Sequence, residues 1–345
     1  MLLQIRPKPC RGQQTWTLLL FVGMLLLTIF LLFSTKPQRT SSNLMKLFEN
    51  HNQPVEDLDH AMNPFAGINN ETGADHPIVP NIVHFILFED PQMSFMHFVC
   101  VLAALRNQRP DRIYFHTNVA PSGNYWERLL KLGPFTERLV LRHMEMPTEI
   151  FHQRIRPRWR VFHGGDIARI RVLMQYGGIF LDNDSYVVRS LDFFRRFEMT
   201  LGWDENQFLG SQILIAHKDA RFLYRWLHSY DKAYNSKRWY YNAGELPTTS
   251  VLHHHPELVH RVKVLFGNDL KFRYKLFRQY WPDWRQHYTF HLLARHLGKL
   301  RNISSVATYP VVFDEYNVQN YPITFREMAN EVLDFEKHLL KGGDF

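Results

Sequence analysis

The stretch from His163 to Asp184, HGGDIARIRVLMQYGGIFLDND, predicts a helix that runs directly into a buried strand. Apolar residues recur at helical spacing between 167 and 174. Asp166 stands where an N-cap is expected, after two glycines that permit a tight turn. The glycine pair at 177–178 ends the helix, and the apolar run 179–181 follows as a strand. The segment is therefore typical of an α/β protein.

Two carboxylates, Asp182 and Asp184, follow this strand directly. In extended chain they point the same way, because side chains alternate between faces. Paired carboxylates at the carboxyl end of a buried strand suit a hard divalent cation, at the sheet edge where ligands usually bind. Asp-x-Asp is also common in surface turns. Such a turn does not need the preceding helix, whose first turn carries Asp166 and Arg169 on one side.

Alternating strands and helices precede the motif. The alternation predicts a parallel sheet with helices on both faces. The region from 222 to 300 is mostly helical by pattern. The predicted strands before the motif are 82–87, 112–116 and 139–141, and the predicted helices are 94–106 and 125–132.

The central pattern, Asp166-x-x-Arg169-Ile170-x-x-Leu173 followed by Gly177-Gly178-Ile179-Phe180-Leu181-Asp182-x-Asp184, resembles the Asp-x-Asp sugar-binding glycosyltransferases. That family includes lactosylceramide α-1,4-galactosyltransferases and yeast initiating α-1,6-mannosyltransferases. The segment 80–86 is similar to the family's first strand, where the nucleotide base lies. The resemblance spans residues 78 to about 300 and implies a glycosyltransferase A-type, Rossmann-like single domain.

The resemblance also implies roles for individual residues. Asp182 and Asp184 would form the catalytic pair, Asp182 contacting ribose or metal and Asp184 ligating the metal, most often Mn²⁺. Asp166 and Arg169 would hold hydroxyls of the donor sugar. The nucleotide would lie near His84, Phe85 and Ile86, and the acceptor or donor near Gln212, Trp239, Tyr241 and His291.

The implied reaction retains the anomeric configuration, commonly explained by front-face attack in which the departing phosphate helps to take the acceptor's proton. The implied donor is a nucleotide sugar, a UDP-sugar in preference to GDP-mannose, and the transferred group is a hexose or N-acetylhexosamine. The residues do not distinguish among glycan, glycolipid and glycoprotein acceptors. An oligomer of identical or different chains is compatible with the sequence.

The amino-terminal region predicts a membrane anchor. Residues 12–35 carry no charge, and the apolar run 16–33 would span about 27 Å as a helix, close to a thin bilayer's hydrocarbon thickness. Basic residues before it favour a cytosolic tail at 1–11. A cleaved signal peptide is the alternative, but its apolar core is usually shorter.

The expected organisation is a single-pass type II Golgi membrane protein. The anchor at 12–35 is followed by a flexible stem at 36–77 and a lumenal catalytic domain at 78–345. N-x-Ser/Thr triplets at Asn70 and Asn302 are candidate N-glycosylation sites in that compartment.

The net charge limits the classes of binding partner that we expect. A formal net charge of +8 favours anionic small molecules or acidic glycans, and nucleic acid is not expected. Four arginines alternate from Arg154 to Arg160, either to bind an acidic acceptor or diphosphate or as a solvated basic loop.

Two functional classes remain open, an active transferase and a catalytically inactive, lectin-like or scaffolding protein of the same fold. Intact Asp166, Arg169, Asp182 and Asp184 favour the active transferase. Signatures of serine hydrolases, P-loop proteins and zinc peptidases are absent from the sequence.

Overall fold

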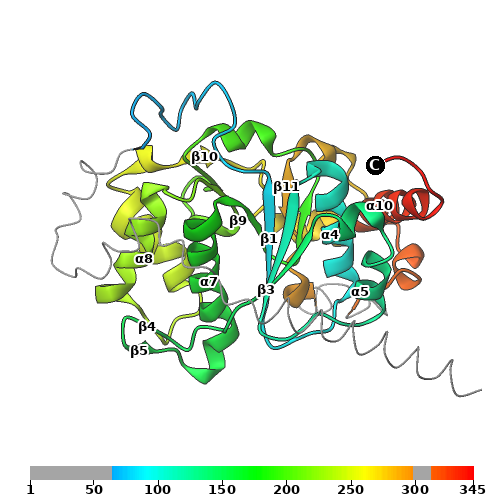
Figure 1. Ribbon diagram of the computed structural model, residues 1–345, viewed down its shortest axis with the longest axis horizontal. Coiled ribbons are helices and arrows are strands. Elements are labelled where there is room, and N and C mark those ends of the chain that lie inside the picture. Colours follow the sequence, from blue (N-terminus) through cyan, green and yellow to red (C-terminus); the bar gives the residue numbers. More distant parts are fainter. Residues whose placement is uncertain (1–63, 298–311) are drawn as a thin grey trace, which may run out of the picture. The chain divides into compact units, whose positions relative to one another are not determined.

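In the computed structural model, which describes residues 64–297 and 312–345, a central sheet lies between two layers of helices (Figure 1). Seven described strands form the sheet in the order β10-β8-β9-β6-β1-β2-β3. Their bounds are β1 (Ile82–Leu87), β2 (Arg112–Thr117), β3 (Leu139–His143), β6 (Gly178–Leu181), β8 (Met199–Gly202), β9 (Gly210–Ala216) and β10 (His260–Val262).

The sheet is mixed. Strands β3, β2, β1 and β6 are mutually parallel, whereas β9 runs antiparallel to both β6 and β8. The predicted α/β class is therefore confirmed, but an all-parallel sheet is not. The chain returns through β9 next to β6, so the start of β9 lies at the same edge as the end of β6. That edge carries the Asp-x-Asp motif.

Strand alternation divides the apolar residues into two cores. Ile179 and Leu181 pack on one face of β6, in the core that contains α4. Phe180 faces the other core, which α7 and α8 complete. All four residues of β6 are buried, as expected for a strand covered on both faces.

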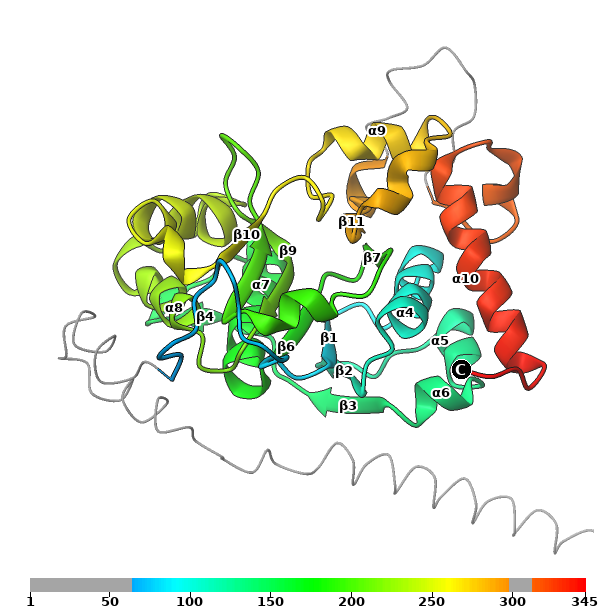
Figure 2. The ribbon, with the colours of Figure 1, turned by 90° about the horizontal axis from the view of Figure 1, so that it is seen from above.

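Helices cover both faces (Figure 2). Helix α10 packs on α4 on one side, and α7 and α8 pack together on the other. The α-helices are α4 (Phe95–Gln108), α5 (Asn124–Leu129), α6 (Gly133–Thr136), α7 (Arg160–Tyr176), α8 (Arg221–Ala233), α9 (Lys271–Phe277) and α10 (Thr324–Leu340). Two further two-stranded sheets pair β4 (Glu149–Ile150) with β5 (Gln153–Arg154), and β7 (Ser185–Val187) with β11 (Thr289–His291).

The predicted strands at 82–87, 112–116 and 139–141 are confirmed, as are the predicted helices after the first two. The region from 222 to 300 is less helical than predicted. Besides α8 and α9 it contains short helical turns and the three-residue strands β10 and β11. Such short strands carry too few residues to show a period-two pattern in the sequence.

The folded part begins earlier than predicted. Within the expected stem, Phe65 is only 3% exposed, and Ala74 N donates to Arg196 O at 2.8 Å. Residues 64–77 therefore pack on the domain, because one aromatic anchor and a few backbone hydrogen bonds order a segment without periodicity. The expected anchor at 12–35 lies outside the described residues. No helix among residues 64–297 and 312–345 is long and apolar enough to cross a bilayer.

Candidate active site

The Asp-x-Asp motif forms a tight turn after β6 and is not a continuation of the strand. Ser185 N donates to Asp182 O at 2.8 Å, closing the turn. Asn183 Nδ2 donates to Ile86 O at 2.9 Å, which ties the turn to the end of β1. Asp182 N donates to Gln212 O at 2.8 Å, which ties it to β9 on the other side. The turn is thus fixed between two neighbouring strands.

The motif helix begins at Arg160, six residues before the predicted N-cap Asp166. The glycine pair 164–165 lies inside the helix, not in a turn before it. Gly164 packs tightly, since a Cβ there would approach Met146 Cγ to 3.0 Å and Pro147 O to 3.2 Å. Asp166 and Arg169 consequently lie in the second and third helical turns, and both are buried.

The Arg169 guanidinium contacts oxygens of three different elements. Nη2 faces Asp166 Oδ1 at 3.1 Å and Asp182 Oδ1 at 3.3 Å. Nη1 donates to Ser211 O at 2.6 Å and to Ser211 Oγ at 3.2 Å, and Nε donates to Gly165 O at 3.3 Å. Nε and Nη1 thus donate to backbone and hydroxyl oxygens, whereas Nη2 is in ion-pair contact with the two carboxylates. Arg169 therefore joins α7, β6 and β9, and it also lines the cavity described below, where its predicted contact with the donor sugar stays a prediction.

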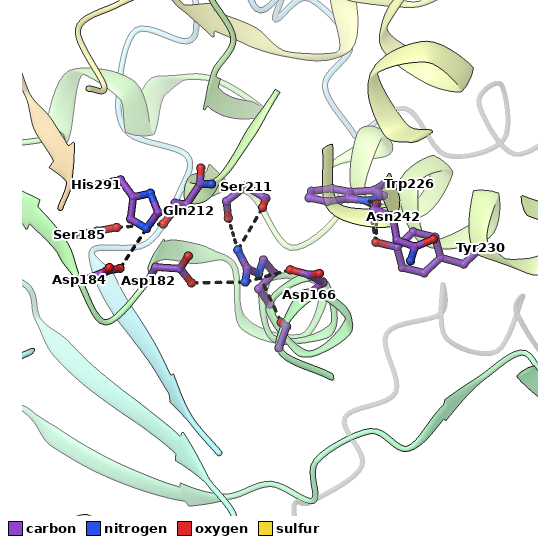
Figure 3. Close-up of polar contacts among 12 residues, drawn as sticks. Asp166, Asp182, Asp184, Ser185, Ser211, Gln212, Trp226, Tyr230, Asn242 and His291 are labelled. Atoms are coloured by element: carbon purple, nitrogen blue, oxygen red, sulfur yellow. Dashed lines mark hydrogen bonds and ion pairs between the residues drawn. The ribbon is translucent and has the colours of Figure 1, made fainter. Parts of the chain in front are cut away.

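His291 reaches the motif through the pairing of β7 with β11. His291 is opposite Ser185 in that ribbon, and Leu292 N donates to Asp184 O at 2.8 Å. His291 Nε2 lies 3.1 Å from Asp184 Oδ1 (Figure 3). Ala294 N donates to Asp184 Oδ2 at 2.8 Å.

The same contacts set the charge states of this pair. Burial alone would raise the pKa of Asp184, but the His291 charge and the hydrogen bonds from His291 and Ala294 hold it well below its usual range. Burial opposes a charge on His291, yet Asp184 raises the pKa of His291 above its ordinary value.

Asp182, Asp184 and His291 can share one cation. Each offers a ligand atom, and these atoms all lie within 4.8 Å of one another. Two carboxylates and an imidazole suit Mn²⁺ or a similar divalent ion. Among the residues that the structure describes, this is the one group of three or more such side chains that could hold a metal. The predicted metal pair thus gains a third candidate ligand, His291.

The group opens into a cavity of about 440 Å³ at the carboxyl ends of β1 and β6. Asp166 and Gln212 also line it. Burial raises the pKa of Asp166 to about 6 despite the nearby Arg169. Gln212 Oε1 is buried and accepts no hydrogen bond from the described residues. Unsatisfied buried acceptors are rare and mark places where a ligand group can complete the pairing.

Comparison with known proteins finds a family match for one segment of the chain. Residues 96–208 match the family described as glycosyltransferase sugar-binding region containing DXD motif. The chain carries this DXD region. The predicted family is confirmed, and its matched segment contains Asp166, Arg169, Asp182 and Asp184.

A curated relative, glucan organizing enzyme 1 of Cryptococcus neoformans, is 27% identical over 172 residues. The match covers 45% of this chain and 44% of the relative, so the chain spans less than half of that protein's length. Solved structures to which the chain is similar include the galactosyltransferase LgtC, with a TM-score of 0.37 and 12% identity over 66% of this chain and 97% of that one. The glycosyltransferase GlyE of Streptococcus pneumoniae gives 0.43 and 10%, covering 76% and 63%.

Several predicted site residues lie away from the cavity of the DXD region. His84 and Phe85 are fully buried inside β1, and only Ile86 of the predicted nucleotide-binding trio lines the cavity. His84 and Phe85 lie inside the strand, before its carboxyl end, and are covered by protein, so they do not face a ligand in the cavity. Asn302 lies outside the described residues. Asn70 is 5% exposed and its Nδ2 donates to Glu257 O at 3.0 Å, so a glycan on that nitrogen would have to break this contact.

Trp239 lines the cavity, whereas Tyr241 does not. The carbonyl of Asn242 accepts hydrogen bonds from Trp226 Nε1 at 3.1 Å and Tyr230 OH at 2.8 Å (Figure 3). This anchor fixes the start of the helical turn at 241–245. Tyr241 consequently packs on the core of α7 and α8, with the Arg238 guanidinium 4.8 Å from its ring centre.

The cavity also includes residues that the sequence did not single out, namely His97, Phe162, Ser211 and Arg295. His97 follows the N-cap of α4, just past the end of β1, and this position is a usable signal because such helix starts face the ligand edge of a sheet. Arg295 follows His291 by four residues, but only the β7–β11 pairing shows that both reach the cavity.

Proposed function

We propose that this protein is a metal-dependent, retaining glycosyltransferase that moves a hexose or N-acetylhexosamine from a nucleotide sugar to a glycan, glycolipid or glycoprotein acceptor. The convergence of Asp182, Asp184 and His291 on one point carries the proposal. A binding-only protein would have no need for three metal-ligating side chains at the floor of its cavity. Their position within or beside the DXD region supports a role at the donor diphosphate.

The cation would be held by Asp182, Asp184 and His291. Their mixed oxygen and nitrogen ligands favour Mn²⁺. When bound, the cation would neutralise charge on the diphosphate leaving group. Asp166 and Gln212 offer the acceptors for hydroxyls of the donor sugar, since each lines the cavity. Arg169 acts on this arrangement indirectly, by orienting Asp166 and Asp182.

The fold proposal is the glycosyltransferase A type, with Ile86 at the nucleotide side of the cavity. The cellular proposal follows from the uncharged stretch at 12–35, which supports a type II anchor and a Golgi location. UDP-sugars are the favoured donors, and catalysis would use front-face attack without a separate protein base.

A donor panel tests this function directly. The full chain, kept in solution with detergent, would be titrated with UDP-galactose, UDP-N-acetylglucosamine, UDP-N-acetylgalactosamine and GDP-mannose, each with Mn²⁺ and with EDTA. We expect one of them to bind and to be hydrolysed slowly only when Mn²⁺ is present. Equal binding with Mn²⁺ and EDTA, with no hydrolysis of any donor, would support the lectin-like alternative.

A further inference from the structure

The mouth of the cavity carries a continuous row of aromatic rings, here named the aromatic track, formed by Trp159, Phe162, Trp239 and His296. Trp159 and Phe162 contact edge to face at 5.9 Å between ring centres. Phe162 meets Trp239 at 6.4 Å, and Trp239 meets His296 at 6.0 Å. Phe162, Trp239 and His296 line the cavity, so the track leads from the donor site outward to Trp159.

Part of this track faces solvent. Trp239 is 42% exposed, and its contacts with Phe162 and His296 make it part of a contiguous aromatic surface, which marks interaction sites more often than a single exposed ring does. Flat aromatic faces suit the apolar faces of sugar rings, and they add contact area with little loss of side-chain freedom. A row of such rings at the mouth of a sugar-nucleotide cavity is therefore a surface for the acceptor.

Guanidinium groups lie on the track. The Arg158 guanidinium is 4.7 Å from the Trp159 ring centre, and that of Arg295 is 4.3 Å from the Phe162 ring centre. A guanidinium stacked on a ring keeps its N–H edge available for a carboxylate or a sulfate. Both arginines are exposed, and Arg156 and Arg160 lie in the same segment as Arg158.

The arginines of this surface have no carboxylate of the described residues in ion-pair contact, although Arg295 is close enough to Asp166 to help lower its pKa. In the part of the chain that the structure describes, Arg156, Arg158, Arg160 and Arg295 form no ion pair. The nearby Arg238 contrasts with them, since it pairs with Glu245. Other surface arginines of the domain pair in the same way, including Arg138 with Glu137 and Arg195 with Asp192. Arg158 and Arg295, which stack on the track, are thus free to pair with anionic groups of an acceptor.

We infer that the acceptor is an anionic oligosaccharide, whose sugar rings stack on the aromatic track while its carboxylate or sulfate groups pair with Arg158 and Arg295. This inference rests on the proposed function, because the track matters only if the cavity holds the donor. The shared chemistry is an anionic sugar, and either a uronate or a sulfated sugar would supply it.

The test measures binding of defined oligosaccharides to the full chain in detergent, by calorimetry with saturating donor and Mn²⁺. The probes are a hyaluronan tetrasaccharide, which carries carboxylates alone, a sulfated heparin tetrasaccharide, and neutral chitotetraose. We expect at least one anionic probe to bind about tenfold or more tightly than chitotetraose. The preference between the two anionic probes would identify the charged group.

Matched variants separate this surface from general positive charge. Arg158→Gln/Arg295→Gln should weaken binding of the anionic probe about tenfold or more. Arg112→Gln/Arg326→Gln removes the same charge elsewhere, Arg112 lying at the opposite end of the sheet strands. It should change affinity less than about twofold, because distant exposed charges are screened by salt. Trp239→Ala should weaken binding of the anionic probe as well.

Equal losses in the two double variants, or neutral and anionic probes that bind alike, would overturn the inference. Binding of the donor with Mn²⁺ is recorded in the same titrations. If the donor binds and the anionic probe has no advantage, only the anionic acceptor is wrong. If no donor binds, the proposed function itself fails.

Discussion

Two polar clusters lie buried along the strand β1, one in its middle and one at its carboxyl end, and they differ in nearly every physical respect. In the middle, His84 Nδ1 lies 3.1 Å from His116 Nε2, and His84 Nε2 lies 2.8 Å from Gly177 O. At the end, Asp166, Arg169, Asp182, Asp184 and His291 carry formal charges around an open cavity.

The histidine cluster is closed and neutral. Since a carbonyl can only accept, Nε2 of His84 carries the proton, Nδ1 accepts, and Nε2 of His116 donates. Burial lowers the pKa of His84 to about 4 and holds that of His116 well below its usual range. The rings of Tyr114 and Tyr176 pack against His84. Nothing in this cluster is left for a ligand.

The acidic cluster is satisfied only in part. Asp184 accepts from Ala294 and contacts His291, but the cavity still contains the unpaired Gln212 Oε1 and the carboxylate of Asp166, whose pKa burial raises to about 6. The comparison shows what distinguishes a structural polar cluster from a functional one in this protein. The structural cluster completes its own hydrogen bonds, whereas the functional cluster leaves acceptors facing a cavity.

The largest effect is expected from a substitution that disrupts the functional cluster alone. Asp184→Asn keeps the shape of the side chain and an oxygen for Ala294 N, but it removes the charge that a divalent cation requires. We expect affinity for the donor in Mn²⁺ to fall about 100-fold or more while affinity in EDTA changes little. Calorimetry with the donor selected by the panel measures both values.

The control is Asp111→Asn, an exposed carboxylate just before β2 at the other end of the sheet. It should bind the donor as the unmodified protein does. Unchanged donor affinity of Asp184→Asn in Mn²⁺ would remove Asp184 from the metal site.

A smaller effect is expected from a substitution of Arg169, which holds the functional cluster together. Arg169→Lys keeps the positive charge but has three donors for five oxygens, so Asp166 and Asp182 lose their shared anchor. We expect kcat for donor hydrolysis to fall about 10- to 100-fold with a small change in KM, since misplacement by a fraction of an ångström affects chemistry more than binding.

Arg221→Lys is the matched control, because Arg221 also pairs with a buried carboxylate, Glu198, at 2.7 Å. It should lower the thermal transition without changing kcat. If Arg169→Lys lowers the thermal transition and leaves kcat intact, Arg169 has a purely structural role.

The sequence predicted the strands and helices that carry both clusters better than it predicted the roles of the residues in them. Strands β1 and β6 follow from local patterns that neighbouring residues decide, whereas the extended chain predicted for Asp182–Asp184 is a tight turn in the structure. The role of His84 does not follow from such patterns, because its burial depends on Gly177 and Tyr176 at the far end of α7. His291 was only a tentative contact in the sequence, because the β7–β11 ribbon that carries it to Asp184 joins strands about a hundred residues apart.

The glycine pair before β6 illustrates the same limit. The sequence explains Gly177-Gly178 as a helix stop, and both residues do adopt positive φ, 65° and 115°. The structure adds a packing reason, since a Cβ at Gly178 would lie 2.6 Å from Ile82 O and 2.8 Å from His84 Nε2. The pair therefore brings β6 against β1 beside the histidine cluster, a requirement that no local pattern reveals.

Breaking the closed cluster should affect stability and spare the donor site. His84→Gln leaves His116 and Gly177 O incompletely paired in a buried place, so the free energy of unfolding should fall by about 1–3 kcal/mol. Denaturant titration at pH 7.5 measures the change, with exposed His76→Gln as the control. Donor affinity in Mn²⁺ should stay within about twofold of the unmodified protein, because His84 does not line the cavity. A large loss of donor affinity in folded protein would return His84 to the nucleotide site.

The smallest expected effect is a pH dependence of stability, which tests whether the histidine cluster is neutral. The ordinary pKa of histidine is 6.5, and burial lowers that of His84 to about 4, so between these values the unfolded chain binds a proton that the folded chain excludes. Stability from this group is therefore complete above pH 6.5 and declines as the pH falls toward 4. His116, Arg142, Tyr114 and Tyr176 surround the ring, and none of them supplies a negative charge that would retain the proton.

Asp166 acts in the opposite direction, because its folded pKa of about 6 lies above the ordinary value of 3.8 and favours the folded state as the pH falls. The difference between the unmodified protein and His84→Gln cancels that contribution. We expect this difference in unfolding free energy to shrink by about 1–2 kcal/mol between pH 7 and pH 5, as the proton uptake of the unfolded histidine is lost in the variant. Denaturant titrations of both proteins at the two pH values give the number. A difference independent of pH would show that His84 is protonated, or accessible, in the folded protein, and the closed cluster would then not be neutral.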